Sequence, residues 1–310
     1  MTVLFASSRP LERAENLRAI YEAYAGDKAF VRLSPWRRNP EITSGKYSLL
    51  VADEFPAESP GKAILIGHGI TGGKVSGLDQ LYPYITKKDT DLLTYVITTS
   101  ETMRPISARQ CGVSEERALP LGMPRTDAYV GKTKGDGGTF LAKKRAYLFA
   151  PTYRAKEDPP YPDIDWAYLD GELRDDEVLV VKAHMIGRPW LVNHYRHITE
   201  VPATEASTPY LIDCDVVITD YSSIILDGFL LGKPAVLFEK NLGYLQSRGM
   251  YLRYPEGYTS RYCNDEKGLI RLLRSAVRLN DYEKRCMHMT AGACDGHSTE
   301  RVCELIRSLA

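Results

Sequence analysis

The sequence predicts an α/β fold with parallel β-sheets, divided into two domains. Short apolar runs alternate with segments of helical period along the whole chain, and strands that alternate with helices build β-α-β units. The length of 310 residues suits two domains of ordinary size. A stretch rich in glycine and lysine at 131–144 separates two series of strands, and such a composition is typical of a linker.

The first domain, residues 1–135, begins with a buried strand. We expect strands over 2–6, 47–52, 63–66 and 92–98, and helices over 11–25 and 101–110. Gly112 ends the second helix, because glycine readily adopts the left-handed conformation that closes a helix.

The second domain, residues 136–310, repeats the pattern. We expect strands over 146–150, 178–182, 197–201, 215–219 and 235–239, and helices over 223–231, 265–278, 281–291 and 298–309. Asp265 and Ser298 are suited to cap the helices that follow them. Proteins of this class bind ligands at the carboxyl ends of their strands, so a motif directly after a strand carries most weight.

Composition and charge exclude several classes of protein. The chain has 40 basic and 40 acidic residues, which counts against a nucleic-acid-binding protein. It holds no apolar run long enough to span a bilayer and begins without a basic signal region, so we expect a cytoplasmic protein. Six scattered cysteines include no Cys-x-x-Cys pair, so we expect reduced core thiols and neither a bound metal nor a cofactor.

The first candidate site follows the strand at 63–66. There a glycine-rich turn carries His68, Gly69 and Lys74. Glycines let backbone N–H groups approach an anion, and an imidazole ordinarily titrates near neutrality, which suits a general base. The alternative is a tight turn with a structural histidine. The spacing does not match a P-loop.

The second candidate site follows the strand at 215–219. Ser222 and Ser223 open the next helix, and hydroxyl and N–H groups at a helix start bind phosphate well. The alternative is that the serines only cap the helix. Asp220 and Asp227 are suited to orient neighbouring groups, but not to touch phosphate, because like charges repel.

Other strand ends and turns add polar residues. His184 follows the strand at 178–182 and could stabilise charge in a transition state. Thr152 and Arg154 follow the strand at 146–150, where an arginine fork suits phosphate. Arg125 lies after a proline turn, where contact with the substrate and a hinge or ion-pair role are equally open. Arg301 stands in the first turn of the last helix, where a cation opposes the helix dipole and therefore needs a partner.

Taken together, these segments resemble the CDP-glycerol glycerophosphotransferase family, the teichoic acid primases and polymerases of Gram-positive bacteria and related capsule polymerases. The segments that carry the resemblance lie at 68–74, 99–105, 122–127, 149–154, 219–224, 231–234 and 295–301. Their order covers most of the chain from about residue 45 onward.

The resemblance implies a GT-B fold: two Rossmann-like domains that face a central cleft, with the last helix packed back on the first domain. It implies transfer of glycerol phosphate, or a related polyol phosphate, from a CDP-activated donor to an acceptor hydroxyl, with release of CMP. The acceptor would be a polyol-phosphate or lipid-linked glycan, and membrane contact at the inner face would be peripheral at most.

The same resemblance assigns roles to residues. His68 in the acceptor-side domain would be the base, and His184 in the donor-binding domain would contact the pyrophosphate. Ser222 and Ser223 would hold phosphate, and the regions of Arg154 and Arg301 would line the donor site. Two alternatives stay open: a GT-B glycosyltransferase that uses a nucleotide sugar, and a catalytically idle binding subunit of a polymer-synthesis complex.

Overall fold

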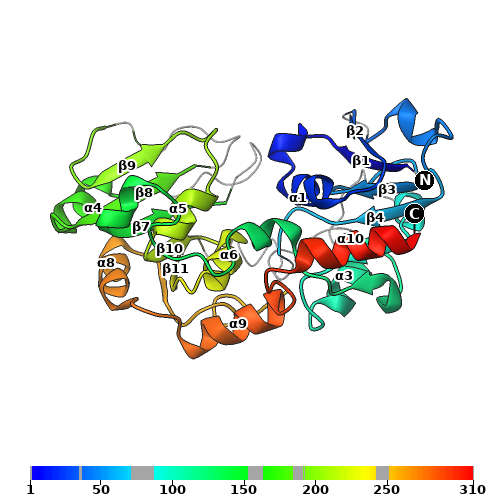
Figure 1. Cartoon of the computed structure of the whole chain (residues 1–310). Coiled ribbons are helices and arrows are strands. Elements are labelled where there is room, and N and C mark those ends of the chain that lie inside the picture. The colour runs from blue at the N-terminus through cyan, green and yellow to red at the C-terminus, as the bar shows by residue number, and fades with distance from the viewer. Residues whose placement is uncertain are drawn as a thin grey trace. The chain divides into compact units, whose positions relative to one another are not determined.

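The computed structural model describes residues 2–34, 37–70, 87–152, 163–183, 191, 193–241 and 251–309. The chain forms two compact units (Figure 1). Unit 1 holds the described residues up to Val130 and those from His288 onward, and unit 2 runs from Gly131 to Met287. Each unit contains one six-stranded sheet in which every paired strand is parallel. The predicted fold class is therefore confirmed.

The sheet of unit 1 has the strand order β2-β1-β3-β4-β5-β6. Its strands are β1 (Val3–Ser7), β2 (Lys28–Arg32), β3 (Leu49–Ala52), β4 (Lys62–Leu65), β5 (Tyr95–Ile97) and β6 (Ala118–Leu119). The central strands β1 and β3 are buried along their whole length, which explains why they read as continuous apolar runs.

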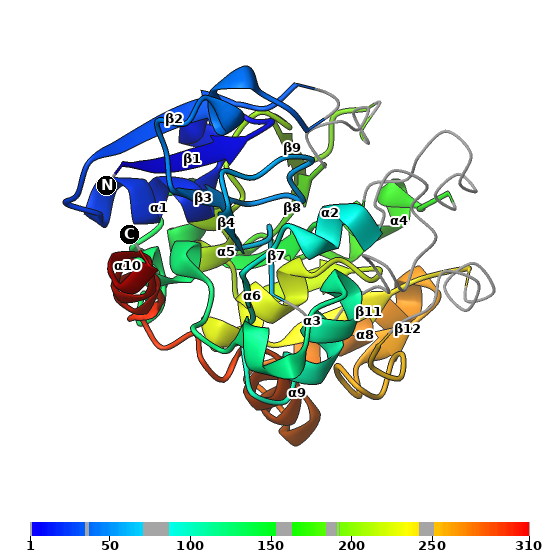
Figure 2. The same ribbon diagram turned by 90° about the vertical axis from the view of Figure 1, so that its right-hand side faces the viewer.

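The two faces of this sheet are filled by alternate residues of each strand. Val3 and Phe5 of β1 point to one face, where α1 (Glu15–Ala23) and α10 (Ser298–Leu309) pack. Leu4 and Ala6 point to the other, toward Cys111 at the end of α3 (Arg104–Cys111). Such alternation is the period of an extended chain. Figure 1 shows α10 beside α1, and in Figure 2 the two termini lie at the same end of unit 1.

The last helix is thus part of the core that the first strand begins. The helix α3 ends at Gly112, whose φ of 62° is left-handed, as its position in the sequence predicted. Other helical segments in the described part of unit 1 are α2 (Lys87–Asp91) and the 3₁₀ segments Leu11–Arg13, Pro40–Thr43, Glu115–Arg117 and Pro124–Ala128.

The sheet of unit 2 has the strand order β12-β11-β10-β7-β8-β9. Its strands are β7 (Arg145–Phe149), β8 (Glu177–Lys182), β9 (Ile198–Val201), β10 (Val216–Thr219), β11 (Ala235–Phe238) and β12 (Tyr262–Cys263). Tyr147 and Phe149 of β7 face a core closed by α4 (Trp166–Glu172) and α8 (Glu266–Ser275). Asp265 caps α8 by accepting a hydrogen bond from Gly268 N at 2.6 Å, as predicted.

On the opposite face of that sheet, α6 (Ile224–Leu230) approaches β10 closely. A Cβ atom added at Gly228 would lie 2.8 Å from Val217 Cγ2 and 3.8 Å from Leu211 Cδ1, which belongs to α5 (Thr208–Asp213). Only a residue without a side chain permits this spacing of helix and strand. The helix α9 (Asp281–Ala291) crosses from unit 2 into unit 1.

The stretch at 131–144 begins where the chain passes from unit 1 to unit 2, and it is an ordered part of unit 2 rather than a flexible linker. The buried carboxylate of Asp213 accepts hydrogen bonds from the backbone N–H groups of Gly135, Gly137 and Thr139 at 2.8, 3.0 and 2.7 Å. A 3₁₀ segment, Phe140–Lys143, follows. Glycines serve here as tight-turn residues around one anion, and composition alone does not separate that use from flexibility.

The strands that sequence patterns missed are either short or only partly buried. The strands β6 and β12 have two residues each, and the edge strand β2 is only half-buried. The six cysteines are free and buried, as predicted. In the parts of the chain that the structure describes, no helix is long and apolar enough to cross a membrane.

Candidate active site

Three polar residues meet at the carboxyl edge of the first sheet. Arg9 follows β1, Asp53 follows β3, and His68 follows β4. These strands are neighbours in the sheet, so their carboxyl ends lie side by side, where proteins of this class place their ligands. The prediction singled out His68 by its position after a strand, and the structure places two further charged side chains beside it.

The three side chains form one hydrogen-bonded cluster. Arg9 Nη2 donates to Asp53 Oδ2 at 2.7 Å and lies 2.6 Å from His68 Nδ1. His68 Nδ1 is 3.6 Å from the same Oδ2. The carboxylate side chain is 1% exposed, whereas the side chains of Arg9 and His68 are 37% and 53% exposed. A buried anion therefore underlies two exposed groups that a ligand can reach.

Asp53 is charged in the folded protein. Burial by itself would raise its pKa, but the neighbouring His68 ring, the charge of Arg9 and the Ser7 hydroxyl together hold the pKa below its ordinary value of 3.8. A buried carboxylate is stable as an anion only where such partners offset the loss of water.

Asn16 on α1 braces the backbone around this cluster. Its buried side chain donates from Nδ2 to the carbonyl of Gly67 at 3.0 Å and accepts at Oδ1 from the N–H of Arg125 at 2.9 Å. Gly67 has a φ of 78°, so the turn before His68 needs a glycine. Gly69, on the other side of His68, is partly exposed. The side chain of Arg125 donates at 3.3 Å to Oη of Tyr129, the residue that follows its own 3₁₀ segment.

In unit 2, Asp220 organises the carboxyl ends of β7 and β10. Its Oδ1 accepts hydrogen bonds from Thr152 N at 2.9 Å and Thr152 Oγ1 at 2.7 Å, and from Tyr221 N at 2.6 Å. The carboxylate is fully buried. Asp220 thus orders the two strand ends, which is the orienting role that we expected for it. The hydroxyl hydrogen of Thr152 is donated to this carboxylate.

The two serines lie between this carboxylate and the helix. The helix α6 begins at Ile224 rather than at Ser223, and Ser223 makes no capping hydrogen bond with its side chain. Ser222 is partly exposed and Ser223 exposed. Helix capping, the alternative use of these hydroxyls, is therefore not what Ser223 does, whereas Ser222 Oγ accepts a long hydrogen bond of 3.5 Å from the N–H of Ile224, the first residue of α6. Asp227 is buried within α6.

Arg301 has the partner that its position required, and that partner is in unit 1. Its guanidinium donates to both carboxylate oxygens of Asp295, at 2.8 and 3.0 Å, to the carbonyl of Leu121 at 3.0 Å and to the carbonyl of Ala293. These contacts raise the pKa of Arg301 and lower that of Asp295 to about 2. The guanidinium holds loops of unit 1 together, and we therefore give it no part in the donor site.

The cap of the last helix is also different from the prediction. The carboxylate of Asp127 accepts from Ser298 N at 3.1 Å and from Thr299 N at 2.6 Å. We expected the Ser298 side chain to cap this helix, but the backbone N–H of Ser298 is instead one of the groups that Asp127 caps. An aspartate from a distant segment satisfies the free N–H groups of the helix and complements its dipole.

Three of the predicted site residues, Lys74, Arg154 and His184, lie outside the described residues. The sequence reading missed Arg9, Asp53 and Asn16. Arg9 and Asp53 each follow a predicted strand within three residues, which is the same signal that identified His68, whereas nothing in the local sequence marks Asn16.

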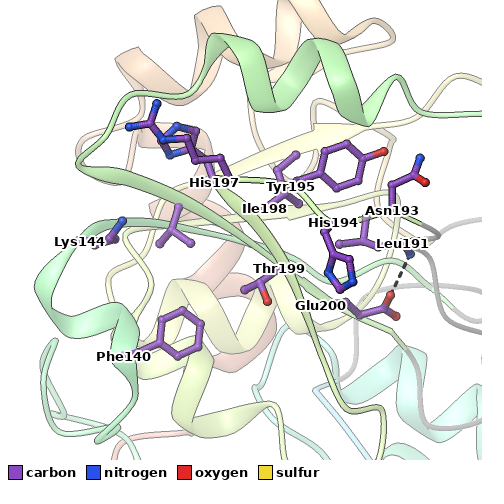
Figure 3. A pocket seen from close by; sticks show the side chains of 12 residues that line it. Phe140, Lys144, Leu191, Asn193, His194, Tyr195, His197, Ile198, Thr199 and Glu200 are labelled. Carbon is purple, nitrogen blue, oxygen red and sulfur yellow. Dashed lines mark hydrogen bonds between the residues drawn. The ribbon is translucent and has the colours of Figure 1, made fainter.

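A pocket of about 590 Å³ lies in unit 2, at the end of the sheet opposite to Thr152 and Asp220 (Figure 3). It is lined by Phe140, Lys144, His194 and the first residues of β9, and the backbone N–H of Leu191 donates to Glu200 Oε2 at 2.9 Å beside it. Lys144 precedes β7 and Ile198 begins β9, so this pocket is at the amino ends of the strands. The predicted site residues Thr152 and Asp220 lie at the carboxyl ends, and the pocket is separate from them.

The fold and the strand-end residues define an α/β protein of two Rossmann-like units with polar groups at the carboxyl ends of parallel strands. A sequence model of the family CDP-Glycerol:Poly(glycerophosphate) glycerophosphotransferase matches residues 53–308. The chain belongs to this family. The match begins at Asp53 and includes His68.

Several characterised proteins are similar to this chain. The teichoic acid poly(ribitol-phosphate) polymerase of Bacillus spizizenii is 25% identical over 98% of this chain and 56% of its own length. The teichoic acid glycerol-phosphate primase of Bacillus subtilis is 26% identical over 69% of this chain and 58% of its own length. The chain thus spans less than two thirds of these two relatives. The wall teichoic acid polymerase TagF shares the fold, with a TM-score of 0.78 and 19% identity over 99% of this chain and 88% of that one.

Proposed function

We propose that this protein transfers glycerol phosphate, or a related polyol phosphate, from a CDP-activated donor to an acceptor hydroxyl and releases CMP. The acceptor is a polyol-phosphate chain or a lipid-linked glycan at the inner face of the cell membrane. Family membership and the names of the two bacterial relatives support the reaction class. The observation that carries the proposal is the exposed His68 ring above the buried carboxylate of Asp53.

In this reaction, His68 takes the proton of the acceptor hydroxyl at Nε2. The acceptor oxygen attacks the β-phosphorus of the donor, a new P–O bond forms, and the bond to the bridging oxygen breaks, so that CMP leaves with the electron pair. Ser222 and Ser223 donate hydrogen bonds to phosphate oxygens. Positioned donors of this kind stabilise charge that develops in a transition state. The contributions of His184, Lys74 and Arg154 stay predictions.

Replacement of the proposed base tests the function. We expect His68→Gln to lower CMP release from CDP-glycerol by about 10²- to 10⁴-fold, the range for loss of a general base. His297→Gln is the matched control, because its ring is 68% exposed and, among the described residues, pairs only with Glu300 on the same helix turn at 3.5 Å. Near wild-type turnover of the His68→Gln enzyme would refute the assignment of the base.

The donor class is tested separately. CDP-glycerol or CMP should raise the thermal midpoint, since a ligand that binds only the folded state stabilises it, and UDP-sugars should leave it unchanged. Stabilisation by a UDP-sugar alone would favour a glycosyltransferase. Stabilisation by CDP-glycerol without CMP release, in the presence of a glycerol-phosphate polymer, would favour a binding subunit.

A further inference from the structure

Arg9 and Asp53 impose opposite protonation patterns on the ring of His68. A guanidinium has only donors and a carboxylate has only acceptors. Arg9 Nη2, 2.6 Å from Nδ1, can bond to that atom only as the donor, so Nδ1 offers its lone pair. The single proton of the neutral ring then sits on Nε2, since the bond at one ring nitrogen determines where the proton is.

This tautomer cannot perform the proposed step. A base must accept the hydroxyl proton at the exposed ring nitrogen, but there Nε2 already carries hydrogen. After proton transfer both ring nitrogens carry hydrogen, so a donor at Nδ1 must have left. The only acceptor near Nδ1 among the described residues is Asp53 Oδ2, at 3.6 Å. The productive ring therefore bonds through Nδ1–H to Asp53, in the place that Arg9 now occupies.

Arg9 has the properties of a group that can leave. Its Nη2 bridges Asp53 and His68 with both hydrogens, while Nε and Nη1 have no partner in the described part of the chain. The side chain is 37% exposed. Three unused donors in a planar fork suit a phosphate, which can take two of them at once.

A second carboxylate beside this cluster, that of Glu54, is engaged elsewhere. Glu54 accepts a hydrogen bond from the N–H of Ser8, next to Arg9 in the chain. Arg9 and Asp53 therefore compete for His68 Nδ1, and these two residues are also hydrogen-bonded to each other.

We propose that Asp53 is the positioning residue of the base and that Arg9 is a substrate-phosphate ligand whose departure from Nδ1 converts His68 into its base-competent tautomer. This inference rests on the proposed function and deepens it. Without substrate the site holds His68 as an Nε2–H donor. Binding of a donor phosphate draws Arg9 away, Nδ1–H bonds to Asp53, and the Nε2 lone pair becomes available for the acceptor hydroxyl.

The tautomer of His68 is measured directly by ¹⁵N NMR of the imidazole nitrogens, at a pH where the ring is neutral and without substrate. The His68→Gln variant assigns the signals. We expect Nε2–H in the wild type and Nδ1–H in Arg9→Met, which removes the competing donor. Arg13→Met, an exposed arginine on the neighbouring 3₁₀ segment, should keep the wild-type tautomer. Addition of CDP-glycerol to the wild type should produce the Nδ1–H form.

Kinetics separate the two residues. We expect Asp53→Asn to lower kcat by about 10²-fold with little change in KM, because the neutral amide no longer stabilises the imidazolium that forms when the base takes the proton. Arg9→Met should mainly raise the KM for CDP-glycerol. A structural role for either residue would lower the amount of folded enzyme without this split between kcat and KM.

Two results would overturn the proposal: an unchanged Nε2–H tautomer in Arg9→Met, or a kcat of Asp53→Asn within about twofold of the wild type. The NMR result stands even if Asp53→Asn fails to fold, because Arg9→Met tests the competition alone. The NMR result is also independent of the proposed function. The function is refuted if no CMP is released from CDP-glycerol, whereas the tautomer in the free enzyme is measured without turnover.

Discussion

Arg9 and Arg301 each pair with an aspartate in unit 1, but they differ in how many of their donors are occupied. Arg301 contacts Asp295 through Nη1 and Nη2, the carbonyl of Ala293 through Nη2 and the carbonyl of Leu121 through Nε. We call this guanidinium saturated because each of its three nitrogens donates. Arg9 contacts Asp53 and His68 through Nη2 alone, among the described residues. A saturated guanidinium fixes loops, whereas one with spare donors beside an exposed imidazole can serve a ligand. The count of occupied donors therefore distinguishes a structural ion pair from a functional one.

The largest effect should come from crowding the saturated pair. In Gly122→Ala the new Cβ would lie 2.3 Å from the carbonyl oxygen of Ala293, a partner of Arg301, and the φ of 87° is itself unfavourable for alanine. We expect a loss of about 3 kcal/mol or more in the free energy of unfolding, measured by urea denaturation.

Gly131→Ala is the matched control for that substitution. Its φ is 83°, but nothing lies within 4 Å of the added Cβ, so only the backbone cost of about 1–2 kcal/mol applies. Equal losses for the two variants would show that the packing around Ala293 gives way freely.

Removal of the saturated guanidinium comes next. Arg301→Met leaves two carbonyls and Asp295 without their donor, and we expect a loss of about 1–3 kcal/mol. The KM for CDP-glycerol should not change. Arg307→Met, an exposed arginine on the same helix, should have little effect on either quantity. A raised KM for Arg301→Met at full stability would restore the donor-site role that the family resemblance implies.

The cap of α10 has a smaller effect. Asp127→Ala removes the acceptor of Ser298 N and Thr299 N, and we expect a loss of about 1 kcal/mol. Asp127→Asn keeps a side-chain acceptor and should lose less. If both variants unfold at the wild-type urea midpoint, water replaces the carboxylate at no cost.

The smallest effect is a pH dependence of the saturated pair. Since the Arg301 hydrogen bond lowers the pKa of Asp295 from 3.8 to about 2, the carboxylate stabilises the fold fully above its ordinary pKa. That contribution is lost as the pH falls from about 4 through about 2. The stability difference between wild type and Asp295→Asn should therefore shrink across this window. A difference that is constant with pH would contradict the ion pair.

Local patterns in the sequence determined much of the framework. Apolar runs located β1, β3, β4, β7, β8, β10 and β11 to within about three residues at each end, because burial on both faces of a parallel sheet requires continuous apolar strands. The Asp265 cap and the Gly112 helix end are also local, since each depends on residues within one turn. His68 was found because a strand end is visible in the sequence.

Only the tertiary structure decided which residues became partners. Arg9, Asp53 and His68 come from three different strand ends and meet because the sheet order places β1, β3 and β4 side by side. Arg301 could have served a ligand by its position alone, yet the fold gives it Asp295, Leu121 and Ala293. Strand order and helix docking arise from burial summed over the whole core, which no short stretch of sequence contains. The chemical properties of the individual residues could therefore be predicted from the sequence, whereas the fold determined which of them became part of the site.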